Sequence, residues 1–163
     1  MTSKLEKKIS FLKYYQLTGV ILGLLLLIYL MLNLNFSEIK LFEIGIVSLM
    51  IIFFGLNFYV YLLLKKKKYV LGLKWFSFLL ILQLISITID DFFYSAVNLF
   101  GLNFVLDFTK DSIIGFDFQV SHIMLTFTSN FETFLVKLNL EAIFMLFYIS
   151  KIYQELKDIN IKI

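Results

Sequence analysis

Four runs of mainly apolar residues, each about twenty residues long, constrain the possible folds of this chain most strongly. They lie at about 14–34, 44–64, 69–89 and 134–153. A helix needs about 20 apolar residues to cross the hydrocarbon core of a bilayer. Hydrophobic residues make up 60% of the chain and charged residues 17%, whereas a soluble domain is roughly half apolar and a quarter charged. We therefore predict four transmembrane helices.

The lysines, which are all fifteen of the basic residues, predict how these helices are oriented. Twelve lie in the two terminal tails or around the link between the second and third runs. The opposite side has three lysines and eight acidic residues. Because cytoplasmic loops are enriched in lysine, both termini are predicted to be cytoplasmic. A basic cluster in the second link is also expected to contact anionic lipid headgroups; it consists of Lys65, Lys66, Lys67 and Lys68.

The expected fold is an all-α membrane protein, a single domain 1–163 built as an antiparallel bundle of four transmembrane helices. The first run follows a basic segment, as a secretory signal does, but its apolar part is too long and no small-residue cleavage site follows. It is therefore predicted to remain as an anchor. The bias toward Lys, Ile, Phe and Asn indicates an AT-rich bacterial genome, and hence the cytoplasmic (inner) membrane.

The link between the third and fourth runs, about 90–133, is predicted to form a small β element outside the membrane. Apolar residues alternate along Phe100–Phe108 and Phe116–Val120, with a polar, turn-like stretch between them. Alternation with aromatic enrichment favours a strand, so we predict an antiparallel hairpin, with a third strand through Ile123, Leu125 and Phe127 as an extension. An amphipathic interfacial helix near Phe92–Phe100 is the alternative. Large exposed apolar patches mark partner sites, and the predicted docking face comprises Phe100, Leu102, Phe104, Leu106, Phe108, Phe116 and Phe118.

Glu141 is the strongest candidate for a functional residue among the polar residues, because it lies one to two turns inside the fourth run. An ionisable side chain at such a depth is costly and often functional. It would line a polar cavity together with Asp90 and Asp91, or it would simply form a salt bridge with Lys137, four residues earlier. The full candidate polar cluster comprises Glu141, Asp90, Asp91, Lys137, Gln83 and Ser86.

The chain has no cysteine and one histidine, which excludes disulfides, thiolate sites and multi-histidine metal sites within one copy. No catalytic residue, metal or cofactor is expected, and the placement of the lysines beside apolar runs argues against nucleic acid as a partner. We expect a non-enzymatic membrane subunit that docks through its aromatic β segment. Its partners would be the lipid bilayer and another envelope protein or a second copy. Two alternatives stay open: a small oligomeric transporter or channel with Glu141 in a polar cavity, and a membrane-embedded enzyme that uses Asp90, Asp91 and Glu141.

Overall fold

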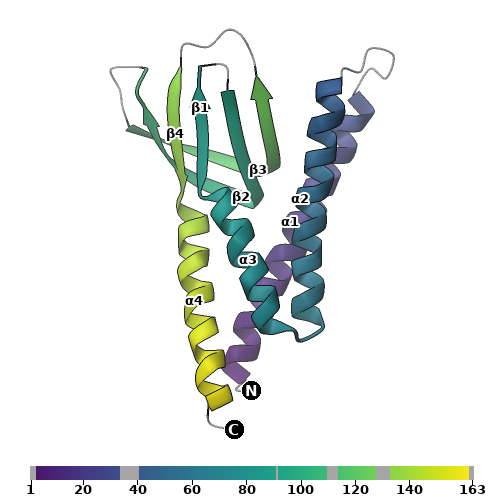
Figure 1. Cartoon of the computed structure of the whole chain (residues 1–163), viewed down its shortest axis with the longest axis vertical. Coiled ribbons are helices and arrows are strands. Elements are labelled where there is room, and N and C mark those ends of the chain that lie inside the picture. Colours follow the sequence, from purple (N-terminus) through teal and green to yellow (C-terminus); the bar gives the residue numbers. More distant parts are fainter. Residues whose placement is uncertain (1–2, 34–40, 91, 110–113, 128–132, 162–163) are drawn as a thin grey trace.

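Four helices and one four-stranded antiparallel sheet make up the fold (Figure 1). The computed structural model describes residues 3–33, 41–90, 92–109, 114–127 and 133–161. Both termini and the turn between α2 and α3 lie at one end of the molecule, which we call the lysine-rich end, and the sheet lies toward the other (Figure 1). The elements are α1 (Ser3–Asn33), α2 (Leu41–Lys65), α3 (Tyr69–Gln83), β1 (Ile85–Ile89), β2 (Phe92–Asp107), β3 (Ile114–Phe127), β4 (Phe134–Asn139) and α4 (Leu140–Ile161).

The predicted bundle of four transmembrane helices is wrong. Within the described ranges, two helical segments are long and apolar enough to cross a membrane, Ser3–Asn33 and Glu43–Lys65. The third apolar run is divided between α3 and β1, and the fourth between β4 and α4. Hydropathy did not reveal these divisions, because the apolar residues of β1 and β4 continue the hydrophobic runs of α3 and α4 without a break.

The two helix–strand junctions lie side by side, and the local sequence favours each of them. After α3, the β-branched residues Ile85, Ile87 and Ile89 favour an extended backbone. Before α4, the Oδ1 atom of Asn139 accepts hydrogen bonds from the backbone N–H groups of residues 141 and 142, at 3.1 Å each. This is an N-cap, which satisfies donors that the first helical turn leaves free. The backbone N–H of Asn139 donates to the carbonyl of Leu84 at 2.9 Å, which joins the two junctions.

The sheet has the strand order β1-β4-β2-β3, with an additional pairing between β1 and β2. The strands β1, β4 and β2 each pair with the other two, so these three strands form a closed arrangement. The first half of β2 pairs with β1 and its second half with β4, while β3 follows β2 along both halves. The predicted hairpin strands are therefore parts of the longer strands β2 and β3. The predicted third strand is the end of β3, and the alternative helix at Phe92–Phe100 is wrong because that segment lies in β2.

The bend in β2 is a bulge between Val97 and Phe100. Leu99 adopts a φ of 78°, a left-handed conformation that is rare for a residue with a branched side chain. The bulge removes two backbone N–H groups from the ladder, and side chains accept their hydrogen bonds. The N–H of Asn98 donates to Gln83 Oε1 and that of Leu99 to Ser121 Oγ, both at 2.7 Å. A buried donor without a partner would be costly, so these two side chains stabilise the bend.

The helices pack closely where α1 carries glycine. A Cβ at Gly23 would lie 2.1 Å from the Phe54 ring of α2, and one at Gly19 would lie 2.4 Å from Asn98 of β2. These glycines let α1 approach α2 on one side and the bulge on the other. At the lysine-rich end, Lys8 of α1 forms an ion pair with Glu155 of α4.

Candidate functional site

The predicted docking face lies on the outer surface of the sheet. We call it the aromatic face, and it consists of Phe100, Leu102, Phe104, Leu106, Phe108, Phe116 and Phe118. Its rings pair across the strands. The rings of Phe100 and Phe118 stack at 6.2 Å between centroids, and those of Phe104 and Phe116 meet edge to face at 5.7 Å. Phe116 is 70% exposed and Phe118 is 63% exposed. An isolated chain in water would gain from burying such rings, so this surface is a candidate contact site.

The opposite face of the same strands is mainly small and polar, and most of it is buried. We call it the polar face; it includes Gly101, Asn103, Asp117, Gln119, Lys137 and Asn139. Asn103 is directly opposite Asn139 on one side and Asp117 on the other, and its side chain is fully buried. In a soluble antiparallel sheet the apolar face packs on the core and the polar face meets water. This sheet has the reverse arrangement, which is typical of strands whose outer face contacts lipid.

An ion pair joins β4 to β3 across the polar face. The Nζ atom of Lys137 lies 2.6 Å from Asp117 Oδ2, and both side chains are partly buried. Gln119 Nε2 donates to the same carboxylate oxygen at 2.9 Å. Lys137 therefore forms its ion pair within the sheet. The alternative prediction of a salt bridge between Lys137 and Glu141 is wrong.

The hydrogen bonds continue from Gln119 toward the bulge. Ser95 Oγ lies 3.0 Å from Gln119 Oε1, and 2.9 Å from both Ser86 Oγ and His122 Nε2. A serine beside a histidine suggests a nucleophile and its base. Ser95 is fully buried, however, so no substrate reaches it in this conformation. We interpret the group as a structural network that satisfies polar side chains inside the sheet.

A second polar group lies where α1 meets the bulge. The Tyr15 hydroxyl donates to the carbonyl of Asn98 at 3.0 Å, and Asn98 Nδ2 donates to Gln16 Oε1 at 3.0 Å. Ser121 Oγ donates to the carbonyl of Gly19 at 3.2 Å. The carboxyl group of Glu141 lies within hydrogen-bonding reach of the Tyr15 hydroxyl. These bonds hold the sheet against α1 and α4.

The structure does not gather the predicted polar cluster into one site. Glu141 contacts Tyr15, and Lys137 pairs with Asp117. Gln83 supports the bulge, while Ser86 joins the network inside the sheet. Asp90 lies in the turn between β1 and β2, at the far end of the sheet from Glu141, and Asp91 lies outside the described residues. Sequence reasoning missed Asn98 and Asn103; the polar positions that alternate with the phenylalanines were the available signal for Asn103.

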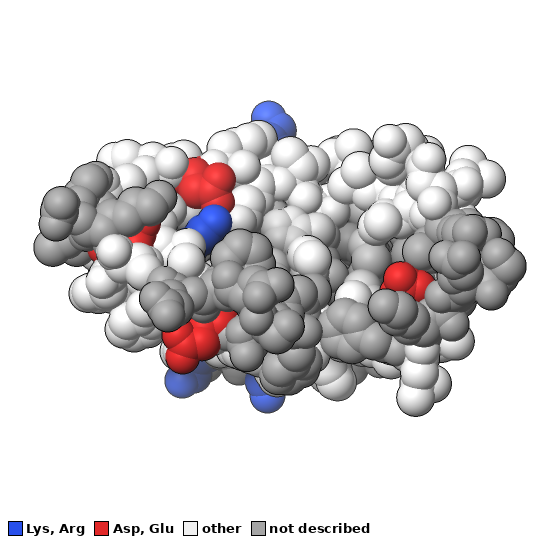
Figure 2. Space-filling model, turned by 90° about the horizontal axis from the view of Figure 1, so that it is seen from above, with Lys and Arg blue, Asp and Glu red and all other residues white. Residues whose placement is uncertain are grey.

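Among the described residues, charge is sparse at the sheet end of the molecule. Viewed from that end, most of the described atoms belong to uncharged residues, with isolated acidic and lysine side chains between them (Figure 2). Among the described lysines, Lys137 alone lies in the sheet, and the others lie in the helices or the turn at Lys65–Lys68. No family model, curated protein or solved structure matches this chain, so its function has to be argued from the geometry.

Proposed function

We propose that this chain is an integral membrane protein that crosses the bilayer through α1 and α2, and that its sheet binds a membrane-embedded partner protein. The two candidate spans have mean hydropathies of 2.1 and 2.2. Only 33% of each apolar stretch is buried inside the molecule, which leaves most of its surface available for lipid. This membrane placement is the basis of the proposal.

The position of the lysines supports an orientation with both termini in the cytoplasm. The N-terminal part of α1, the Lys65–Lys68 turn and α4 bring the lysines together at one end of the molecule. Cytoplasmic loops carry this excess of positive charge. The protein would then belong to the cytoplasmic membrane of a bacterium, with the sheet directed toward the outer side.

The reversed sheet is the observation that carries the proposal. The helices α1 and α2 extend beside the sheet almost to its far end (Figure 1), so a bilayer that surrounds them also surrounds the sheet. The aromatic face then meets hydrocarbon, and the charges of Lys137 and Asp117 are kept on the polar face, in contact with each other. Placement of the sheet within the bilayer thus accounts for both its apolar outer face and its polar inner face.

The need for a protein partner comes from the edge of β3. In the described part of the chain β3 pairs with β2 along one edge and with no strand along the other. The helices α1 and α2 contact β3, α1 through Ser121. Backbone N–H and C=O groups left without partners in hydrocarbon cost several kcal/mol each. A polypeptide that adds a strand or packs over this edge would satisfy them. We therefore propose that the function is assembly with such a partner, through the edge of β3 and the adjoining aromatic face.

The observations favour docking over the transporter alternative. A transport path centred on Glu141 would bring other ionisable groups to it, but Lys137 is paired inside the sheet and Asp90 lies at the far end of β1. The enzyme alternative requires Asp90 to meet Glu141, and the same separation argues against it.

The docking proposal predicts a site-specific crosslink. A photoreactive benzoylphenylalanine in place of Phe116 or Phe118, activated in native membranes, should give one protein adduct of fixed size. These two residues are the most exposed of the aromatic face and lie on β3, which among the described residues pairs with a strand along one edge only. Electrophoresis and mass spectrometry of the adduct would identify the partner.

Phe147 on α4 provides a matched control, because it is 69% exposed and Phe116 is 70% exposed. The same photoreactive residue at Phe147 should not give this adduct, and Phe118→Lys should remove the adduct formed from position 116. Failure to obtain a protein adduct from either sheet position, or an identical adduct from position 147, would contradict the proposed docking surface.

A further inference from the structure

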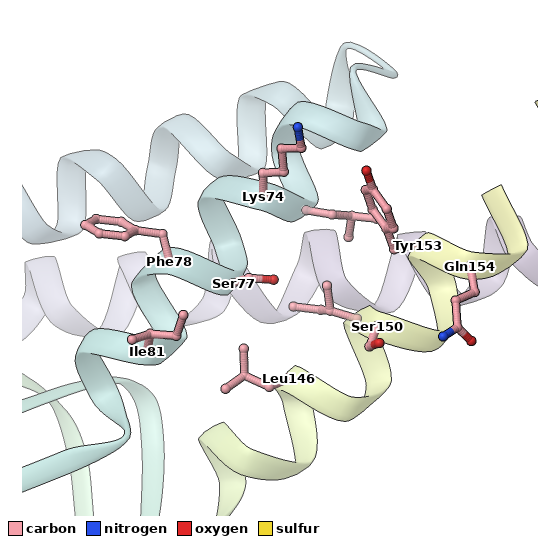
Figure 3. Close-up of a pocket in the computed structure, with 10 residues that line it drawn as sticks. Lys74, Ser77, Phe78, Ile81, Leu146, Ser150, Tyr153 and Gln154 are labelled. Carbon is pink, nitrogen blue, oxygen red and sulfur yellow. The ribbon is translucent and has the colours of Figure 1, made fainter. Parts of the chain in front are cut away.

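A groove lies between α3 and α4, remote from the aromatic face. Its volume is about 570 Å³, within the range of about 300–1,000 Å³ that is usual for ligand sites. Ten residues line it, and Figure 3 shows how they are arranged. Since α3 and α4 both extend to the lysine-rich end, the groove runs from that end toward the sheet.

The two ends of the groove differ in chemistry. Lys74 of α3 and Tyr153 and Gln154 of α4 line the groove toward the lysine-rich end (Figure 3). Phe78, Ile81 and Leu146 lie toward the sheet, and Phe78 and Ile81 are each about half exposed. A ligand that fits this groove has a polar headgroup and an apolar chain.

The charges of the groove favour an anionic headgroup. Lys74 contributes a cation, and no acidic side chain is among the residues that line the groove. The nearby acid of α4, Glu155, forms its ion pair with Lys8 of α1. In the membrane orientation argued above, Lys74 lies on the cytoplasmic side, where anionic lipids attract lysine.

We propose that the groove between α3 and α4 binds one anionic phospholipid, with its phosphate at Lys74 and an acyl chain along Phe78, Ile81 and Leu146. The small side chains of Ser77 on α3 and Ser150 on α4 line the groove and leave room for the chain between the two helices. This inference rests on the membrane placement in the proposed function but not on the docking partner.

The only tryptophan of the chain reports on this site. Trp75 lies on α3, next to Lys74, and its ring meets that of Phe78 edge to face at 5.9 Å. The full-length protein would be reconstituted in nanodiscs of phosphatidylcholine that contain brominated phosphatidylglycerol or brominated phosphatidylcholine. Half-maximal quenching of Trp75 should need about fivefold less of the brominated anionic lipid, which corresponds to the attraction of one lysine near a membrane surface.

Two variants separate a built site from general attraction to the membrane. Lys74→Gln should abolish the preference for the anionic lipid, whereas Lys151→Gln, which removes an exposed lysine of α4 outside the groove, should keep it. Ser77→Leu should fill the groove and reduce quenching by the anionic lipid to the level of the neutral one.

The outcomes distinguish this inference from the proposed function. Equal quenching by both brominated lipids, or a preference that survives Lys74→Gln, would overturn the lipid site and leave the membrane placement intact. Absence of quenching by either lipid would overturn both. A preference that disappears equally in Lys74→Gln and Lys151→Gln would show general electrostatic attraction and would also contradict the site.

Discussion

Gly23→Ala is expected to destabilise the protein by about 1–3 kcal/mol, although alanine normally favours a helix. The new methyl group would lie 2.1 Å from the Phe54 ring, which is 1% exposed and cannot move aside without displacing α2. Overpacking of a tight contact typically costs about 1–3 kcal/mol. Unfolding in mixed micelles with increasing SDS, followed by circular dichroism, measures the change in the free energy of unfolding.

Gly55→Ala in α2 is the matched control. A Cβ at Gly55 meets no atom within 4 Å, so this change adds helix propensity without a clash and should stabilise the helix by up to about 1 kcal/mol. The two substitutions are chemically identical and should have opposite signs. If Gly23→Ala were as stable as Gly55→Ala, the close packing of α1 on α2 would be incorrect.

Gln16→Leu is expected to destabilise the protein by about 1–3 kcal/mol. Its side chain accepts the hydrogen bond of Asn98 Nδ2 at 3.0 Å, and both side chains are almost completely buried. Leucine has a similar size but leaves the amide of Asn98 without an acceptor, and the desolvation cost of a buried donor falls in this range. The same SDS titration measures the loss.

Two comparisons test whether the hydrogen bond is the cause. Thr18→Leu changes an exposed polar residue of the same helix to leucine and should have little effect or a stabilising one. The double variant Gln16→Leu/Asn98→Leu should lose less stability than the sum of its single variants, because it removes both polar partners. Strict additivity would show that the pair does not interact and would contradict the attachment of the sheet to α1 at this point.

The sequence indicated apolar helices long enough to cross a membrane and the alternation in β2 and β3, but not the architecture. The alternation from Phe100 to Phe108 is local, so it was readable without knowledge of the partner strands. The division of the run 69–89 at Gln83 was not readable, because Ile85, Ile87 and Ile89 are as hydrophobic as the leucines of α3. Whether such a run continues as a helix depends on pairing with β4, a contact between distant parts of the chain.

The candidate polar residues were identified by type, but their partners were not. Glu141 and Lys137 are four residues apart and would pair on a continuous helix, yet the change from strand to helix at Asn139 separates them. Lys137 instead reaches Asp117, twenty residues earlier in the chain. Gln83 was assigned to the candidate polar cluster, whereas its Oε1 atom accepts a hydrogen bond from the backbone N–H of Asn98 in the bulge. The contacts of Lys137 and Gln83 join residues far apart in the chain, which local patterns do not specify.

A nitroxide scan along β3 measures most directly whether the reversed sheet lies in hydrocarbon. The chain contains no cysteine, so spin labels can be attached singly at positions 116 to 120 in the reconstituted protein, with Lys66 in the basic turn as the aqueous reference. Labels at 116, 118 and 120 should collide frequently with oxygen and rarely with a water-soluble nickel chelate, while labels at 117 and 119 should be shielded from both. High accessibility to the nickel chelate at 116 and 118, equal to that at 66, would place the aromatic face in water and contradict the account.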